Sequence, residues 1–515
     1  MNRSGCYIST LFFLMACALQ LSNAQANEGY ERVMRRDLWG EGSNVTSILR
    51  DSVTTSYAEI RYGGESGGFR DFSDAESEWS VGAKARTVVH HKSVAMVGAF
   101  DYEHWEGANM CGSMFISPNS YPFDLLEFTP GDKRLQSYYL MGGITTAISD
   151  RFAIGVVGDF KSQNYAKFKD LRHYNYRMEL GVKPSLSYRI GSEERGATIG
   201  ATAIFMRNSE SVRADVVGSA NSTYYAFLDK GLMLGAYENW DGSGVHLNES
   251  GISGFPVREN LYGGAIQGEW GGLFAEVEYI IGSGEVGEKL TYWFDFPSQR
   301  YGVKLGYNLK RLKGGKERLH LFRGDVYMRS LVNNEFVLNN VTEGGVTTTV
   351  TLGSNKIFEQ KELCFAPSYE YMVVGGGDFN IGVNYSNIKS RSTLVYPYIN
   401  DLNTSVLQLY SGGSVNIGGG FQILCRALFS IGSFSEDSYK SDSNAGSEPF
   451  RLTEYYNVEN EYLTATYISG WLGVRYNASK SWYCEIGGGY THAFDLSYVY
   501  GNSRYKWSAS AGYRF

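Results

Sequence analysis

The sequence predicts an all-β protein, a transmembrane antiparallel up-and-down β-barrel of about 18 strands. Three observations predict it. Apolar and polar residues alternate in segments of roughly ten residues, short turns alternate with long polar stretches, and the last segment alternates aromatic residues up to Phe515. The composition agrees, because 62 of the 515 residues are Gly, 39 are Tyr and only 9 are Pro, which is typical of strands and turns. A barrel of 16 or 14 strands also fits the pattern.

The segment from Tyr174 to Tyr188 illustrates the alternation. One face carries Tyr, Met, Leu and Val, and the other carries Arg177, Glu179 and Lys183. A soluble sandwich also alternates, so alternation alone leaves both architectures open. Aromatic residues mark both ends of the apolar face, as interfacial girdles do in membrane barrels. Their position favours strands that expose the apolar face to lipid and the polar face to the lumen.

The connections between strands supply a second signal. Short turns fall at positions such as 149–150, 271–272 and 418–419, and long polar stretches lie between them. This order predicts short periplasmic turns and long extracellular loops. The expected loops are 106–135, 208–257, 331–356 and 436–458. The assignment stays open for 290–296, which is aromatic but lies in an expected loop, and for 347–352, a Thr/Val run able to extend a strand beyond the membrane.

The N-terminus has the pattern of an export signal. Arg3 precedes an apolar run, and Ser22-Asn23-Ala24 places small residues before Gln25. We therefore expect residues 1–24 to be a signal peptide, with a lipoprotein cleavage box at Cys17 as the rival interpretation. Residues 25–51 are expected to form an N-terminal periplasmic or lumenal segment, either a small plug or a solvated tail. Residues 52–515 form the predicted barrel.

The final strand carries the most specific local pattern. Trp507, Tyr513 and the terminal Phe515 share one face, and polar residues occupy the other. Here the sequence resembles the outer-membrane β-barrel proteins of Gram-negative bacteria, and more narrowly an uncharacterised Bacteroidota-type barrel family. The resemblance implies residence in the cell outer membrane, contact with its lipid, and recognition of this C-terminal strand by the barrel-assembly machinery.

Parity assigns charged residues of both signs to the lumen. Either opposite charges pair across neighbouring strands and hold the wall together, or a subset such as Arg323, Asp325 and Arg329 lines a constriction. The predicted lumen-lining residues are Arg177, Glu179, Lys183, Lys304, Arg323, Asp325, Arg329, Arg426, Arg475 and Glu485.

Two expected loops are rich in apolar or aromatic residues. Residues 106–135 contain Met114, Phe115 and Phe123, so we expect this stretch to fold inward and cap the mouth, with a partner-binding patch as the alternative. Residues 208–257 contain Tyr224, Tyr225, Trp240 and Phe255, which suit an extracellular protein partner.

Several kinds of chemistry lack support. A net charge of −7 without a basic stripe argues against nucleic acid. His90-His91 has no third ligand nearby, so neither a metal nor any other cofactor is expected. Cys111, Cys364, Cys425 and Cys484 are widely spaced, and unpaired thiols are the favoured interpretation. No G-x-S-x-G elbow is present, and an enzyme is not expected.

The sequence therefore favours a passive channel or porin-like transporter for a small polar or amphipathic solute. The alternative is a closed barrel that acts as an accessory or assembly partner in an outer-membrane uptake or secretion complex. An outer-membrane hydrolase ranks last.

Overall fold

The computed structural model describes residues 30–50, 54–192, 196–215, 226–231, 237–239, 252–288, 291–393, 399–439 and 451–515. The predicted signal peptide, residues 1–24, lies outside the described residues. Tyr224, Tyr225 and Trp240 of the predicted partner-binding loop also lie outside them.

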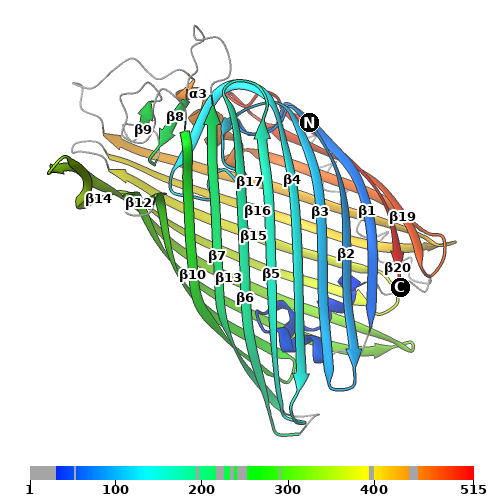
Figure 1. Ribbon diagram of the computed structural model, residues 1–515. Helices are drawn as coiled ribbons and strands as arrows, with labels where there is room; N and C mark the ends of the chain where they lie inside the picture. The colour runs from blue at the N-terminus through cyan, green and yellow to red at the C-terminus, as the bar shows by residue number, and fades with distance from the viewer. Residues whose placement is uncertain are drawn as a thin grey trace.

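The described strands form a closed antiparallel barrel of 18 strands, which confirms the predicted fold (Figure 1). Consecutive strands pair, β7 pairs with β10, and β1 pairs with β20 to close the cylinder. The barrel strands are β1 (Thr55–Gly67), β2 (Ser77–His91), β3 (Val94–Ser113), β4 (Asp124–Ala147), β5 (Phe152–Lys167), β6 (Arg172–Ile190), β7 (Ala197–Asp215), β10 (Ile252–Trp270), β11 (Leu273–Glu288), β12 (Thr291–Lys313), β13 (Lys316–Glu343), β14 (Val346–Val373), β15 (Asp378–Thr393), β16 (Ile399–Gly418), β17 (Phe421–Tyr439), β18 (Thr466–Asn477), β19 (Trp482–Phe494) and β20 (Ser503–Arg514).

The outer surface carries the apolar belt that alternation predicted. On β6, Tyr176, Met178, Leu180, Leu186 and Tyr188 are all exposed, with a Tyr at each end of the row. Exposed apolar side chains are stable at this density only where lipid covers them. The outward face of each strand therefore meets the hydrocarbon core, and the inward face encloses the lumen.

Turns at the two rims differ as expected, but two predicted loops need correction. The loop predicted at 106–135 is confined to 114–123, because β3 continues to Ser113 and β4 begins at Asp124. At the periplasmic rim, Gly271 and Gly272 adopt positive φ angles of 58° and 85°, which a two-residue reversal requires. At the extracellular rim, the predicted loop at 331–356 is wrong. β13 and β14 continue as 28-residue strands to a hairpin at Gly344-Gly345, because paired strands satisfy their backbone groups even beyond the membrane.

The two regions left open in the sequence are also strands. Of 290–296, the described residues from Thr291 onward belong to β12, and 347–352 belongs to β14. The Thr/Val run thus extends a strand past the lipid belt.

Short elements fold over the extracellular end. β8 (Ala226–Asp229) pairs with the start of β4, β9 (Tyr237–Asn239) pairs with β8, and helix α3 (Leu452–Thr464) lies nearby (Figure 1). A buried cluster joins Leu452, Tyr455 and Val458 of α3 to Phe72 and Phe128. The helix is therefore fixed to the barrel mouth by its apolar face.

The N-terminal segment lies inside the barrel near the periplasmic rim (Figure 1). It contains α2 (Tyr30–Arg35), η1 (Leu38–Glu41) and η2 (Val45–Leu49). Trp39 is fully buried against Phe274 at a centroid distance of 6.2 Å, and Leu38 packs with Leu319 and Leu321. The apolar side chains of the N-terminal segment are therefore buried against apolar side chains on the lumenal faces of the strands.

Among the described residues, no helix is both long enough and apolar enough to cross a lipid bilayer.

Candidate functional site

The connection between β3 and β4 folds into the mouth of the barrel, as predicted for a cap. Met114, Phe115 and Phe123 are buried. They belong to one cluster with inward-facing residues of several strands, including Val212, Phe255, Val286, Phe294, Leu331 and Phe358. We refer to residues 114–123 as the cap segment.

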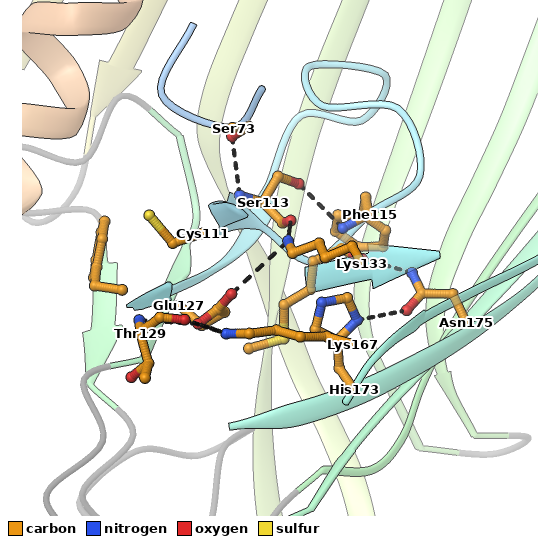
Figure 2. Close-up of polar contacts among 12 residues, drawn as sticks. Ser73, Cys111, Ser113, Phe115, Glu127, Thr129, Lys133, Lys167, His173 and Asn175 are labelled. Carbon is orange, nitrogen blue, oxygen red and sulfur yellow. Dashed lines mark hydrogen bonds and ion pairs between the residues drawn. The ribbon is translucent and has the colours of Figure 1, made fainter. Parts of the chain in front are cut away.

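A buried ionic network lies beneath the cap segment, and Figure 2 shows its members. Nζ of Lys167 lies 2.6 Å from Oε2 of Glu127, and Nζ of Lys133 lies 3.8 Å from Oε1. All three side chains are completely inaccessible to solvent. Lys133 also donates to the carbonyl oxygen of Ser113 at 2.8 Å, and Lys167 donates to the carbonyl oxygen of Thr129. The network therefore joins the ends of β3, β4 and β5.

Further hydrogen bonds hold the cap segment to β6 and β7. Nδ2 of Asn175 donates to the carbonyl oxygen of Met114 at 2.7 Å and to Glu210 at 2.9 Å. Tyr121 donates to the second carboxylate oxygen of Glu210 at 3.2 Å. His173 contacts Asn175 at 3.2 Å (Figure 2), and burial lowers the pKa of His173. A neutral imidazole is therefore expected in this layer.

Two acids lie at the same mouth, of which Asp124 is buried and Glu459 is half-buried. Asp124 precedes the lipid belt, since the exposed side chains of β4 ahead of Tyr138 are polar, namely Asp132, Arg134 and Gln136. Burial raises the pKa of Asp124 to about 8, and burial raises the pKa of Glu459 in α3 to about 7. Their proton-bound forms stabilise the folded mouth. That contribution is complete below the ordinary acid pKa and is lost as the pH rises through 7 to 8.

Ion pairs fix the N-terminal segment to the lumenal wall. Arg323 of β13 contacts Glu41 at 2.5 Å and Glu370 at 2.8 Å. Arg35 contacts the same Glu370 at 2.9 Å, and Lys304 of β12 donates to the carbonyl oxygen of Glu41 at 2.8 Å. The segment therefore narrows the lumen on the β12–β14 side.

An open chamber of 580 Å³ lies on the neighbouring side of the lumen, against β15–β18 and the end of β20. Its charged lining consists of four arginines and one aspartate. Arg35 supplies the side formed by the N-terminal segment, and the wall supplies Arg426, Arg475, Arg514 and Asp378. We refer to this cavity as the arginine chamber.

A second cavity of 280 Å³ lies on the extracellular side of the arginine chamber. Leu428 and Ser469 line both cavities, so the two meet along β17 and β18. Among the lining residues are Glu65, Glu78 and Arg504, and Arg504 contacts the two carboxylates at 3.0 Å and 3.4 Å. We refer to it as the upper cavity.

Three of the predicted lumen residues meet at the arginine chamber. Arg426 and Arg475 line it, and Glu485 contacts Arg475 at 2.6 Å from the neighbouring strand. The alternation in the sequence places all three residues on the lumenal face, but it does not show that they lie close together.

The predicted lumen residues of β12 and β13 have a different role. Lys304 and Arg323 both bind the N-terminal segment, so their role is to anchor it. Asp325 and Arg329 come after Arg323 in the sequence and lie on the same lumenal face of β13.

On β6, Arg177 contacts Glu179 at 2.7 Å and Glu210 of β7 at 3.9 Å. Lys183 lies farther along the same lumenal face, half-buried. The pairs of Arg177 and Arg475 agree with the interpretation that opposite charges support the wall.

Sequence reasoning did not select the remaining members of these sites. Arg514 and Trp471 line the arginine chamber, and Lys133, Lys167 and Glu127 form the buried network. Parity does identify Arg514 as lumenal. The network residues lie near the ends of strands, where the sequence pattern does not show which residues belong to the strand and therefore which face they occupy.

At the C-terminus, Trp507 and Phe515 are exposed at 45% and 78%, and the ring of Tyr513 contacts that of Phe515 edge to face at a centroid distance of 4.9 Å. Their outward position suits contact with lipid, and their recognition by the assembly machinery stays a prediction. No group of three potential metal ligands occurs among the described residues. Cys111, Cys364, Cys425 and Cys484 are unpaired thiols.

A closed barrel with an apolar belt, aromatic rims and a charged lumen defines a class of protein. The chain is an integral membrane β-barrel of the outer-membrane type. Residues 46–515 match the model of a family described as a family of unknown function (DUF6850), and the chain belongs to that family.

Similar solved structures include three outer-membrane receptors, each 9% identical over 90% of this chain. They are the pyoverdine-bound FpvA of Pseudomonas aeruginosa (TM-score 0.40, 72% of that chain), the ferric preacinetobactin receptor BauA of Acinetobacter baumannii (0.41, 80%) and the ferric-catecholate import receptor Fiu of Escherichia coli (0.40, 82%). None of the curated proteins matches the chain.

Proposed function

We propose that the protein is a passive channel for a small polar or amphipathic solute, gated by the elements folded into its mouth. One observation carries the proposal. The upper cavity and the arginine chamber meet at Leu428 and Ser469 and follow one wall of the lumen. Solute that enters the upper cavity needs only side-chain movement to reach the chamber near the periplasmic rim.

The lining of this route supports a polar solute. Charged, hydroxyl and amide side chains make up most of the lining residues, and such groups replace the hydration shell of a permeating molecule. Aromatic rings narrow the entrance, where Phe69 lies 5.1 Å from Tyr462 of α3 and 5.2 Å from Tyr467. An amphipathic solute therefore finds both polar and apolar contacts at the mouth.

The N-terminal segment and the cap leave this side of the lumen open. Residues 25–51 are proposed to be a lumenal segment that sets the width of the route, because Arg35 forms one side of the chamber. The cap segment packs against β7 and β10–β14. Gating is then assigned to α3, whose Tyr462 lines the upper cavity.

A second function is favoured by the large buried clusters in the mouth. If the cap and the N-terminal segment keep the lumen closed, the barrel serves as an accessory or assembly partner for another outer-membrane protein. The C-terminal strand is proposed to contact the assembly machinery in either case. Neither function includes catalysis.

Conductance of the purified full chain in a planar lipid bilayer distinguishes the two functions. The channel is expected to give discrete current steps, and liposomes that contain it are expected to admit small sugars or organic ions. A silent bilayer together with impermeable liposomes contradicts the channel. A specific protein that copurifies from solubilised membranes would then support the partner function.

A further inference from the structure

Only two of the four arginines of the arginine chamber form ion pairs within the described residues. Arg475 is paired with Glu485, and Arg35 is paired with Glu370 and Asp378. Arg426 and Arg514, in contrast, have no carboxylate at ion-pair distance among the described residues. Two guanidinium groups thus line the cavity without an ion-pair partner among the described residues, and Arg514 feels a carboxylate only at longer range, from Glu59.

Neutral groups orient these two guanidiniums. Arg514 donates to Oδ1 of Asn477 at 3.0 Å and lies 4.4 Å from the ring centre of Tyr483. Arg426 lies 5.1 Å from the ring centre of Trp471. Cation–π contact holds a guanidinium in place without neutralising its charge, so both groups keep their attraction for an anion.

Glycine makes room for flat aromatic surfaces in the same wall. A Cβ atom at Gly487 would overlap the ring of Trp471, and a Cβ at Gly382 would overlap the ring of Tyr410. The two rings therefore lie against the backbone of the neighbouring strands. Both of them line the chamber. Because Arg426 lies over the ring of Trp471, the ring of Tyr410 is the one that offers a stacking surface beside the arginines.

We infer that the arginine chamber binds a small organic anion, a carboxylate attached to a planar ring. The inference rests on the proposed channel and names its substrate class. Guanidinium groups bind carboxylates through paired hydrogen bonds, and aromatic side chains stack on a planar ring. A volume of 580 Å³ falls within the range of about 300–1,000 Å³ of small-molecule sites.

Binding to the detergent-solubilised full chain tests the inference, with benzoate as the anionic probe and benzamide as its neutral counterpart. Titration calorimetry is expected to show benzoate binding at least about tenfold tighter than benzamide, because only benzoate forms charged hydrogen bonds with the guanidinium groups. The variants Arg426→Gln and Arg514→Gln are each expected to weaken benzoate binding about tenfold. The matched control is Arg329→Gln, which changes a lumenal arginine outside the chamber. Its benzoate affinity should stay within about twofold of the wild-type value. Circular dichroism verifies the barrel in every variant.

Equal binding of benzoate and benzamide, or absence of benzoate binding, would overturn the inference. So would an Arg329→Gln effect as large as that of Arg426→Gln. A planar bilayer separates this failure from failure of the channel. A chain that conducts but binds benzoate no tighter than benzamide supports the channel and contradicts the anion site. A chain that binds benzoate but never conducts supports the anion site and contradicts the channel.

Discussion

Replacing Glu127 by alanine is expected to release the cap, at a cost of about 3–5 kcal/mol in the free energy of local opening. Glu127 is the carboxylate shared by Lys133 and Lys167, and all three side chains are inaccessible to solvent. Without it, two buried ammonium groups lose their counter-charge. Burial already lowers the pKa of Lys133 to about 8, which shows how weakly this layer tolerates charge. Hydrogen exchange of residues 114–123 measures the opening.

Two further variants separate the charge effect from general damage. Replacing Glu127, Lys133 and Lys167 together by methionine removes all three charges, and this variant should lie closer to the wild type than Glu127→Ala. Asp401→Ala removes the partner of Arg391 from an exposed pair and should change the opening free energy by less than about 1 kcal/mol. Unchanged exchange in Glu127→Ala would show that the network does not hold the cap.

Removing residues 25–50 is expected to raise the single-channel conductance several-fold. The segment occupies the lumen through Trp39, Leu38 and the ion pairs of Arg323. Barrels of 16–18 strands enclose an aqueous channel when nothing fills them. Planar-bilayer recording of the shortened chain beside the full chain measures the difference.

A milder pair of variants supports the same point. Arg323→Met removes the contacts to Glu41 and Glu370 and should raise the open-channel noise and conductance. Arg329→Met changes an arginine on the same lumenal face of β13 and should do neither. A shortened chain that conducts like the full chain would mean that the segment does not limit the route.

Much of the fold was predictable because the barrel repeats one simple constraint. Every strand must place apolar residues outward, so parity along 174–188 or 505–515 is visible without neighbours. The inward cap was predictable for a different reason: Met114 and Phe123 are too apolar for an exposed loop. The long hairpin of β13 and β14 was not, because its polar strands beyond the membrane resemble a loop.

The site was predictable only in part. Parity placed Arg426, Arg475 and Glu485 in the lumen, but it gives no position around the barrel. Pairing between distant segments, such as Arg323 with Glu41, depends on how the N-terminal segment folds back. That fold arises from burial of Trp39 and from charge contacts, neither of which has a periodic signature.

The most direct test of the central claim is the current through Ser469→Trp. Ser469 lines both cavities where they meet, and an indole there fills the junction. The variant is expected to lose most of the wild-type current in a planar bilayer. Asn384→Trp, a lumenal substitution on β15 outside both cavities, is expected to keep it. Wild-type current in Ser469→Trp would contradict conduction along this wall.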